Sequence, residues 1–271
     1  MAPMRISPDC DPRRISGIAL IVADLDAAIA FYCVGLGFAL VGRIGETGAD
    51  ASATLALGGV TLRLDQPRLP GRSYPAERSA NDPWFQHFAI RVADMDAAYA
   101  RLSGQPFTAI SIDGPQQLPA SSGSVIAFKF RDPDGHPLEL SHFPDEPPTI
   151  DGSLFLAIDH SAVAVSNIDA SIAFYIEELG FRVAERVVNQ GPTQWRLDGL
   201  DRAVVDIIVL KPPALGPHLE LLHYQTPIPS TSTSEMAQSD IAATRLLVTA
   251  RSFREILTDP DGHLIELVEA L

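Results

Sequence analysis

The segment Asp24-Leu25-Asp26-Ala27-Ala28-Ile29-Ala30-Phe31-Tyr32 recurs as Asn167-Ile168-Asp169-Ala170-Ser171-Ile172-Ala173-Phe174-Tyr175. Each copy closes on Leu-Gly-Phe, at residues 36–38 and 179–181, and the offset is constant (167 − 24 = 143 and 180 − 37 = 143). Self-similarity at a fixed offset is typical of duplicated structural units. The chain is therefore expected to consist of two related halves.

A second motif repeats in the same order. Residues 132–140 read Asp-Pro-Asp-Gly-His-Pro-Leu-Glu-Leu, and residues 259–267 read Asp-Pro-Asp-Gly-His-Leu-Ile-Glu-Leu. Their offset is 259 − 132 = 127, so the second half is shorter by 143 − 127 = 16 residues. Proline presets φ and glycine allows positive φ, so the motif predicts a structural turn that leads into a strand. His136 and His263 are expected at the surface rather than in a metal site.

Each half is predicted to begin with a strand that leads into a helix. Residues 18–22 and 161–165 are short apolar runs of the kind found in strands. Asp24 and Asn167 then stand where a helix N-cap belongs, because their side-chain oxygens can accept from first-turn amides. Gly180 suits the left-handed position that ends such a helix.

A smaller repeat is nested in the first half, where residues 88–99 imitate residues 18–29. The repeating unit is βαβββ, which predicts an α+β fold. The units lie near residues 14–66, 85–143, 155–225 and 240–269. The fourth unit is truncated and lacks room for most of its helix. The predicted division is a lead-in at residues 1–14, a first domain at 15–145 and a second domain at 153–271.

The composition restricts the possible partners. The formal charge of −14 and the pI near 4.8 oppose binding to nucleic acid or to anionic membranes, because both would repel the chain. The apolar stretch at residues 203–210 is interrupted by Asp206 and is too short to span a bilayer. With only Cys10 and Cys33, no disulfide framework is indicated, and a cytoplasmic location is expected. A small molecule is therefore the expected partner.

The paired βαβββ modules, the Phe-Tyr and Leu-Gly-Phe helix end, and the Asp-Pro-Asp-Gly-His turn before a strand with a central glutamate together resemble the vicinal oxygen chelate superfamily. This superfamily comprises glyoxalases, bleomycin resistance proteins and extradiol dioxygenases. The resemblance covers nearly all of residues 15–269 and implies curved mixed sheets in which two modules close into a cleft. It specifies the fold more than the reaction.

The resemblance also implies where a metal would bind. The opening strand of each module would offer one ligand, usually His or Gln, and its last strand another, usually Glu. In the second half these positions are His160, Glu220 and Glu266, and His218 is a possible further ligand. Glu220 and Glu266 are the candidate catalytic bases.

The alternation of side chains along a strand supports this set independently of the resemblance. His160, Ala162 and Ala164 share one face, and small residues beside a histidine leave room above the sheet. Glu266 stands in an apolar strand, where a carboxylate costs several kcal/mol unless it is paired or bound to metal. Metal ligation, a structural salt bridge or a sheet position that faces water would satisfy Glu266.

The corresponding positions of the first half are Gly17, Arg63, His87 and Glu139, of which only the last two can bind a metal. An arginine beside Glu139 would supply positive charge with bidentate geometry. The first half is therefore interpreted as a metal-free partner, with His87, Glu139 and Arg63 as candidates for a second cleft that holds a small molecule.

One histidine and two carboxylates suit Fe²⁺, Zn²⁺, Mn²⁺, Ni²⁺ or Co²⁺. The predicted function is a metal-dependent lyase, isomerase or dioxygenase acting on a small molecule with adjacent oxygen atoms. Two departures oppose it: the fourth module is short, and Thr244, the nearest match to His87, has no imidazole. A homodimer is one way to close such an open cleft. The alternative is a metal-free binding protein of the bleomycin resistance type.

Overall fold

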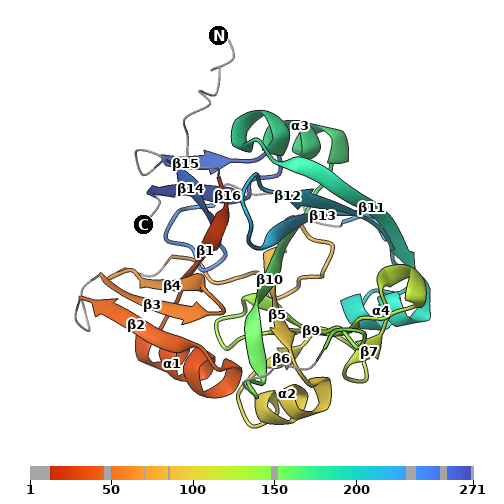
Figure 1. The fold of residues 1–271 in the computed structure, drawn as a ribbon. Coiled ribbons are helices and arrows are strands. Elements are labelled where there is room, and N and C mark those ends of the chain that lie inside the picture. The colour runs from red at the N-terminus through yellow and green to blue at the C-terminus, as the bar shows by residue number, and fades with distance from the viewer. Residues whose placement is uncertain are drawn as a thin grey trace.

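The computed structural model describes residues 13–45, 50–69, 71–84, 86–147, 152–229, 236–250 and 255–269. The predicted lead-in at residues 1–14 lies outside the described residues except for Arg13 and Arg14. Two mixed sheets form the body of the molecule, with helices packed at their outer faces (Figure 1). The α+β fold of paired modules is confirmed.

The first sheet has the strand order β15-β16-β14-β1-β4-β3-β2. These strands are β1 (Ile15–Ile21), β2 (Ala39–Ile44), β3 (Ala51–Leu57), β4 (Val60–Gln66), β14 (Arg245–Ala250), β15 (Glu255–Thr258) and β16 (Leu264–Glu269). The first sheet therefore combines the first module with the fourth.

The second sheet has the strand order β11-β12-β13-β10-β5-β9-β8-β6, and β7 pairs with β8 beside this path. These strands are β5 (Gln86–Val92), β6 (Thr108–Ala109), β7 (Gln116–Gln117), β8 (Ile126–Arg131), β9 (Pro137–His142), β10 (Phe155–Ala164), β11 (Arg182–Gln190), β12 (Val204–Lys211) and β13 (His218–Thr226). The second sheet therefore combines the second module with the third.

This pairing corrects the expectation that the two modules of each half close into one cleft. The opening strands β1 and β14 pair antiparallel, and so do β5 and β10, so each sheet is built from both halves. Every module presents the same kind of opening strand, so hydrophobic periodicity within a module does not specify which other module completes its sheet.

The hydrophobic cores, by contrast, mostly follow the halves. One cluster joins the first module to the second, with Tyr32, Leu62, Phe88 and Phe128 among its buried members. Another joins the third module to the fourth. Within each half, side chains of one module pack against side chains of the other module, which belongs to the other sheet. The backbone hydrogen bonds of each sheet, in contrast, connect the two halves.

The helices form where the sequence predicts them. Asp24 caps α1 (Leu25–Ala30) by accepting from the amide of Ala27, and α1 continues into a π-helical turn at Phe31–Gly35. Asn167 caps α3 (Ile168–Leu179) in the same way, and Gly180 ends it with a positive φ of 70°. The second module carries α2 (Met95–Leu102), and a short 3-10 turn follows at Ala120–Ser122.

The Asp-Pro-Asp-Gly-His turns are structural, as predicted. Asp132 accepts from the amides of Gly135 and His136 at 2.8 and 2.7 Å, and also from the hydroxyl of Tyr32 at 2.7 Å. In the other copy Asp259 accepts from the hydroxyl of Tyr175 at 3.0 Å. Each turn is therefore fastened to the first helix of its own half.

The expectation that the turn histidines lie at the surface is wrong. His136 is 1% exposed and His263 is 5% exposed. The Nε2 atom of His136 lies 3.0 Å from the carbonyl oxygen of Ile21, and that of His263 lies 2.7 Å from the carbonyl oxygen of Ala164. Each ring binds the end of the opening strand of the neighbouring module, which explains its burial.

Two local departures distinguish the second half. In the described part of the fourth module, β14, β15 and β16 occur without a helix, in agreement with the predicted truncation. The third module instead carries an additional helix, α4 (Pro192–Asp198), between β11 and β12. Among the described residues, no helix is both long and apolar enough to cross a membrane.

We expect Tyr175→Phe to lower the free energy of unfolding by about 1–3 kcal/mol, because the buried carboxylate of Asp259 loses a hydrogen-bond donor. Denaturant unfolding followed by circular dichroism measures the change. Tyr99→Phe is the matched control, since its half-buried hydroxyl makes no hydrogen bond to the described residues, and it should change stability by less than about 0.5 kcal/mol. Equal losses in both variants would contradict the fastening role.

Candidate metal centre

Strand register brings four ionisable side chains to one face of the second sheet. In one row across the sheet, His160 lies opposite Ala89, which lies opposite Glu139. In the next row on the same face, Glu220 lies opposite Ala162, which lies opposite His87. Side chains opposite one another on neighbouring strands point the same way, so the two rows place two imidazoles and two carboxylates around two small alanines.

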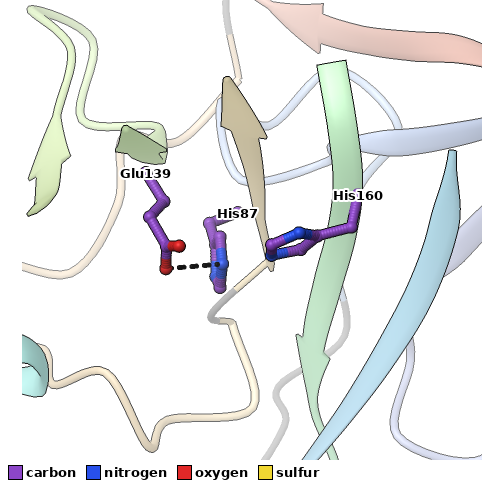
Figure 2. A group of neighbouring side chains, drawn as sticks. All are labelled: His87, Glu139 and His160. Carbon is purple, nitrogen blue, oxygen red and sulfur yellow. Dashed lines mark ion pairs between the residues drawn. The ribbon is translucent and has the colours of Figure 1, made fainter. Parts of the chain in front are cut away.

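The donor atoms of three of these residues, His87, Glu139 and His160, lie close together (Figure 2). The Nε2 atom of His87 is 3.5 Å from an oxygen of Glu139, and the Nε2 atom of His160 is 3.8 Å from an oxygen of Glu220. One ligand atom each of His87, Glu139 and His160 lies within 4.8 Å of the others. Two metal–ligand bonds of about 2.0–2.2 Å each span up to about 4.4 Å, so small side-chain shifts would let these three donors share one ion.

Two further polar residues support the group from its open side. The β10 strand has an irregularity between Ile158 and His160, which brings Asp159 within 3.0 Å of the Nδ1 atom of His160. His218 approaches an oxygen of Glu220 at 3.2 Å. Asp159, His160 and His218 form a second group with metal-ligand spacing, but two of its members are less buried. Through these contacts Asp159 orients His160, and His218 orients Glu220.

The charges of the group compensate one another. Burial would raise the pKa of Glu139, but His87, Lys129 and His160 outweigh burial and lower it. Burial would likewise raise the pKa of Glu220, and His160 and His218 lower it. Both carboxylates are therefore ionised at neutral pH, as metal ligands must be.

The two histidines differ in charge. Burial is the main cause that lowers the pKa of His87, which is neutral at neutral pH. Burial opposes the charge of His160, but Glu220 and Asp159 outweigh it and raise the pKa of His160 to about 9. A cation that binds here would therefore displace a proton from His160.

A cavity of about 450 Å³ opens above the group. Its floor includes His87, Glu139, His160 and Glu220, and its walls carry apolar side chains from β11 and β12. The apolar wall residues include Val187, Val205, Ile207 and Val209. The site thus combines convergent polar groups with an apolar enclosure, as small-molecule sites do.

Comparison with known proteins agrees with this architecture. A family model described as Glyoxalase/Bleomycin resistance protein/Dioxygenase superfamily matches residues 14–140 and 157–248. The chain belongs to this superfamily. The uncharacterized protein YaeR of Escherichia coli is 31% identical over 131 residues, which cover 47% of this chain and 95% of that protein. The virulence protein STM3117 of Salmonella typhimurium is 26% identical, covering 48% and 84% of the two chains.

Solved structures of superfamily architecture match over nearly the whole chain. Glyoxalase I from Zea mays superimposes with a TM-score of 0.64 at 18% identity, covering 95% of this chain and 92% of that one. A putative dioxygenase from Bacillus subtilis gives a TM-score of 0.59 at 13% identity, covering 93% and 84%. At these identities the likeness concerns the fold alone.

The equivalent face of the first sheet has different chemistry. By register, Gly17 stands in place of His160, Arg63 in place of Glu220, and Arg245 in place of His87, while Glu266 stands in place of Glu139. The predicted match of Thr244 to His87 is thus one residue off. Two guanidinium groups, of Arg63 and Arg245, replace two of the ligand positions and pair with the carboxylates of Glu266 and Asp65. Arginine is no metal ligand, so only Glu266 of these four equivalent positions could bind a cation.

Glu266 forms a buried salt bridge and does not join His160 and Glu220. Arg63 donates to both of its carboxylate oxygens, at 3.0 Å through Nη1 and 2.5 Å through Nη2, and Glu266 is 1% exposed. Of the interpretations that the sequence left open for Glu266, namely metal ligation, a salt bridge and a water-facing position, the structure shows the salt bridge. Arg63 is therefore a partner of Glu266 and not of Glu139, and the expected grouping of His160, Glu220 and Glu266 is corrected.

His87 and Glu139 take the place that was expected for Glu266. They were predicted for a separate, metal-free cleft, because each half was assumed to form its own site. One signal in the sequence points to the observed pairing. The second and third modules each keep a histidine and a glutamate at the ligand positions, whereas neither the first nor the fourth keeps both.

For the metal-free protein, we expect the free energy of unfolding to fall by about 1–3 kcal/mol as pH rises from 6.5 to 9. The pKa of His160 is raised in the folded state, so its contribution is fully present below the unfolded value of about 6.5 and is lost as pH passes the folded value. Chemical denaturation in the presence of a chelator measures this dependence.

His160→Gln should flatten the dependence of stability on pH. His223→Gln is the control and should keep this dependence, because His223 lies on the face of β13 that is opposite to Glu220 and the cavity. A wild-type stability that stays constant or rises over this pH range would contradict the charge assigned to His160.

Proposed function

We propose that this protein is a metal-dependent enzyme of the glyoxalase and dioxygenase type, which acts on a small molecule with adjacent oxygen atoms. One divalent ion would be held by His87, Glu139, His160 and Glu220. The observation that carries the proposal is the convergence of three buried side chains, His87, Glu139 and His160, on the floor of a 450 Å³ cavity. The half-buried Glu220 lies beside them, 3.8 Å from His160.

Two imidazole nitrogens and two carboxylate oxygens form a borderline-to-hard donor set. This set suits Fe²⁺, Zn²⁺, Mn²⁺, Ni²⁺ or Co²⁺. Two carboxylates match the charge of a divalent ion, so the proposed site needs no further anion from the protein. When bound, the ion would act as a Lewis acid toward adjacent substrate oxygens.

Glu220 is our candidate for the general base. Its side chain is 19% exposed, against 10% for Glu139, so it has the better access to the cavity. His218 touches it from the open side and would pass a proton onward to solvent. Glu266, the other carboxylate with an expected catalytic role, is engaged by Arg63 in the first sheet and takes no part in this proposal.

A metal-free small-molecule binder is the second candidate. One observation favours this candidate: a protonated His160 neutralises part of the negative charge of Glu220 and Asp159, so these carboxylates do not require a metal ion. The apolar walls of the cavity would then bind a small molecule without converting it to a product. Cytoplasmic location and homodimer formation stay predictions from the sequence.

We expect the protein, purified without a nickel column, to bind about one divalent ion per chain. Glu139→Gln should lower the affinity for that ion by more than about 100-fold, because it removes a direct ligand. Loss of an outer hydrogen-bond partner lowers metal affinity by only roughly 10- to 100-fold. Elemental analysis of dialysed protein and competition with a chelator measure these quantities.

Glu266→Gln is the matched control, because the same substitution at the pseudo-equivalent position breaks a salt bridge outside the site. It should lower stability by about 3–5 kcal/mol and leave the metal content unchanged. A folded wild type that takes up none of the five ions would favour the binder, and loss of metal in Glu266→Gln alone would overturn the proposed ligand set.

A further inference from the structure

A buried lysine lies beside the proposed metal ligands. The Nζ atom of Lys129, on β8, is 2.7 Å from an oxygen of Asp198 and 3.9 Å from an oxygen of Glu139. Its side chain is only 5% exposed, yet it lines the cavity above the metal site. A buried ammonium is costly unless it is paired, so its presence needs a reason.

The fold itself does not require a charge at this position. Lys129 stands directly opposite Glu139 in the ladder between β8 and β9. The equivalent partners in the other three modules are Thr54 opposite Arg63, Val209 opposite Glu220, and Ile256 opposite Glu266. Three of four modules thus place an uncharged side chain here, and the charged one belongs to the sheet with the four metal-ligand residues.

The counter-ion of Lys129 comes from α4. Asp198, at the end of this helix, is fully buried, and its second oxygen accepts from the side chain of Gln194 at 2.7 Å. In the first module, β2 ends at Ile44 and β3 begins at Ala51, so fewer residues connect the corresponding strands. Helix α4 therefore supplies an anion that holds the ammonium of Lys129 at the end of the cavity.

Other contacts already attach α4 to the second module. The amide of Ile112 donates to the carbonyl of Arg196 at 2.7 Å, and the hydroxyl of Ser111 donates to the carbonyl of Leu197 at 2.9 Å. These bonds between uncharged groups already attach the end of α4 to the second module, so the Lys129–Asp198 ion pair is not needed to attach it. Binding of a ligand in the cavity explains the buried pair better than attachment of the helix does.

We propose that the cavity takes a small organic anion whose carboxylate stands next to a second oxygen, as in 2-oxo and 2-hydroxy acids, and that Lys129 binds this carboxylate. This inference rests on the proposed function. A divalent ion is already neutralised by Glu139 and Glu220, so an anionic substrate would add uncompensated negative charge at the site. Lys129 is paired with Asp198, but its ammonium lies only 3.9 Å from an oxygen of Glu139, so it would place a positive hydrogen-bond donor beside a carboxylate bound at the site.

Binding of two probes to the Co²⁺-loaded protein tests the inference. Oxalate carries adjacent oxygens on carboxylates, whereas catechol carries adjacent oxygens without a carboxylate. The visible absorption of the bound Co²⁺ reports binding of each probe. We expect Lys129→Met to weaken oxalate binding about tenfold or more and to change catechol binding less than about threefold, while Lys129→Arg keeps most of the oxalate affinity.

Lys211→Met is the matched control, because it removes the same charge from the rim of the same cavity. It should leave oxalate binding within about threefold of wild type. Thermal melts of every variant separate binding from folding, and Lys129→Gln replaces Lys129→Met if that variant does not fold.

The outcomes distinguish the two proposals. A folded wild type that binds neither Co²⁺ nor Fe²⁺, Zn²⁺, Mn²⁺ or Ni²⁺ overturns the metal-dependent function and this inference with it. The assignment of Lys129 alone is overturned if the wild type binds Co²⁺ but Lys129→Met lowers the affinities for oxalate and catechol equally, or lowers neither affinity.

Discussion

The antiparallel register between β5 and β10 determines the candidate site. It places His87 opposite Ala162 and His160 opposite Ala89, so each imidazole faces the space above a methyl group. The parallel ladders to β9 and β13 then bring Glu139 and Glu220 to the outer ends of the same two rows. A shift of one residue between β5 and β10 would turn either histidine away from the cavity, because neighbouring side chains point to opposite faces.

The two sheets show two ways to satisfy charge on the same backbone. In the first sheet, Glu266 is held by the guanidinium of Arg63, with Arg245 close by. In the second sheet, the carboxylates of Glu139 and Glu220 face His87 and His160. Histidine is a side chain that can also bind a metal. Arginine stays charged at any relevant pH and is no metal ligand, so one sheet is stabilised by an ion pair, while the other keeps side chains that are able to bind a metal.

Packing and hydrogen bonding divide the molecule differently. The cores largely join the modules within each half, whereas the sheets join modules of different halves. The candidate site lies where the second module meets the third, so neither half contains it alone. The pair between Lys129 and Asp198 crosses the same boundary, which links the additional helix α4 to the wall of the cavity.

The sequence by itself determined the modules. Caps such as Asn167, the turns at Asp132 and Asp259, and the truncation of the fourth module all follow from local rules on hydrogen bonding and φ. It also identified His87, Glu139, His160 and Glu220 as candidates. Only the tertiary structure decided how they are grouped, because the four modules carry similar opening strands and local patterns do not say which two strands will pair. That choice placed Glu266 beside Arg63, and it brought His87 and Glu139 to His160 and Glu220.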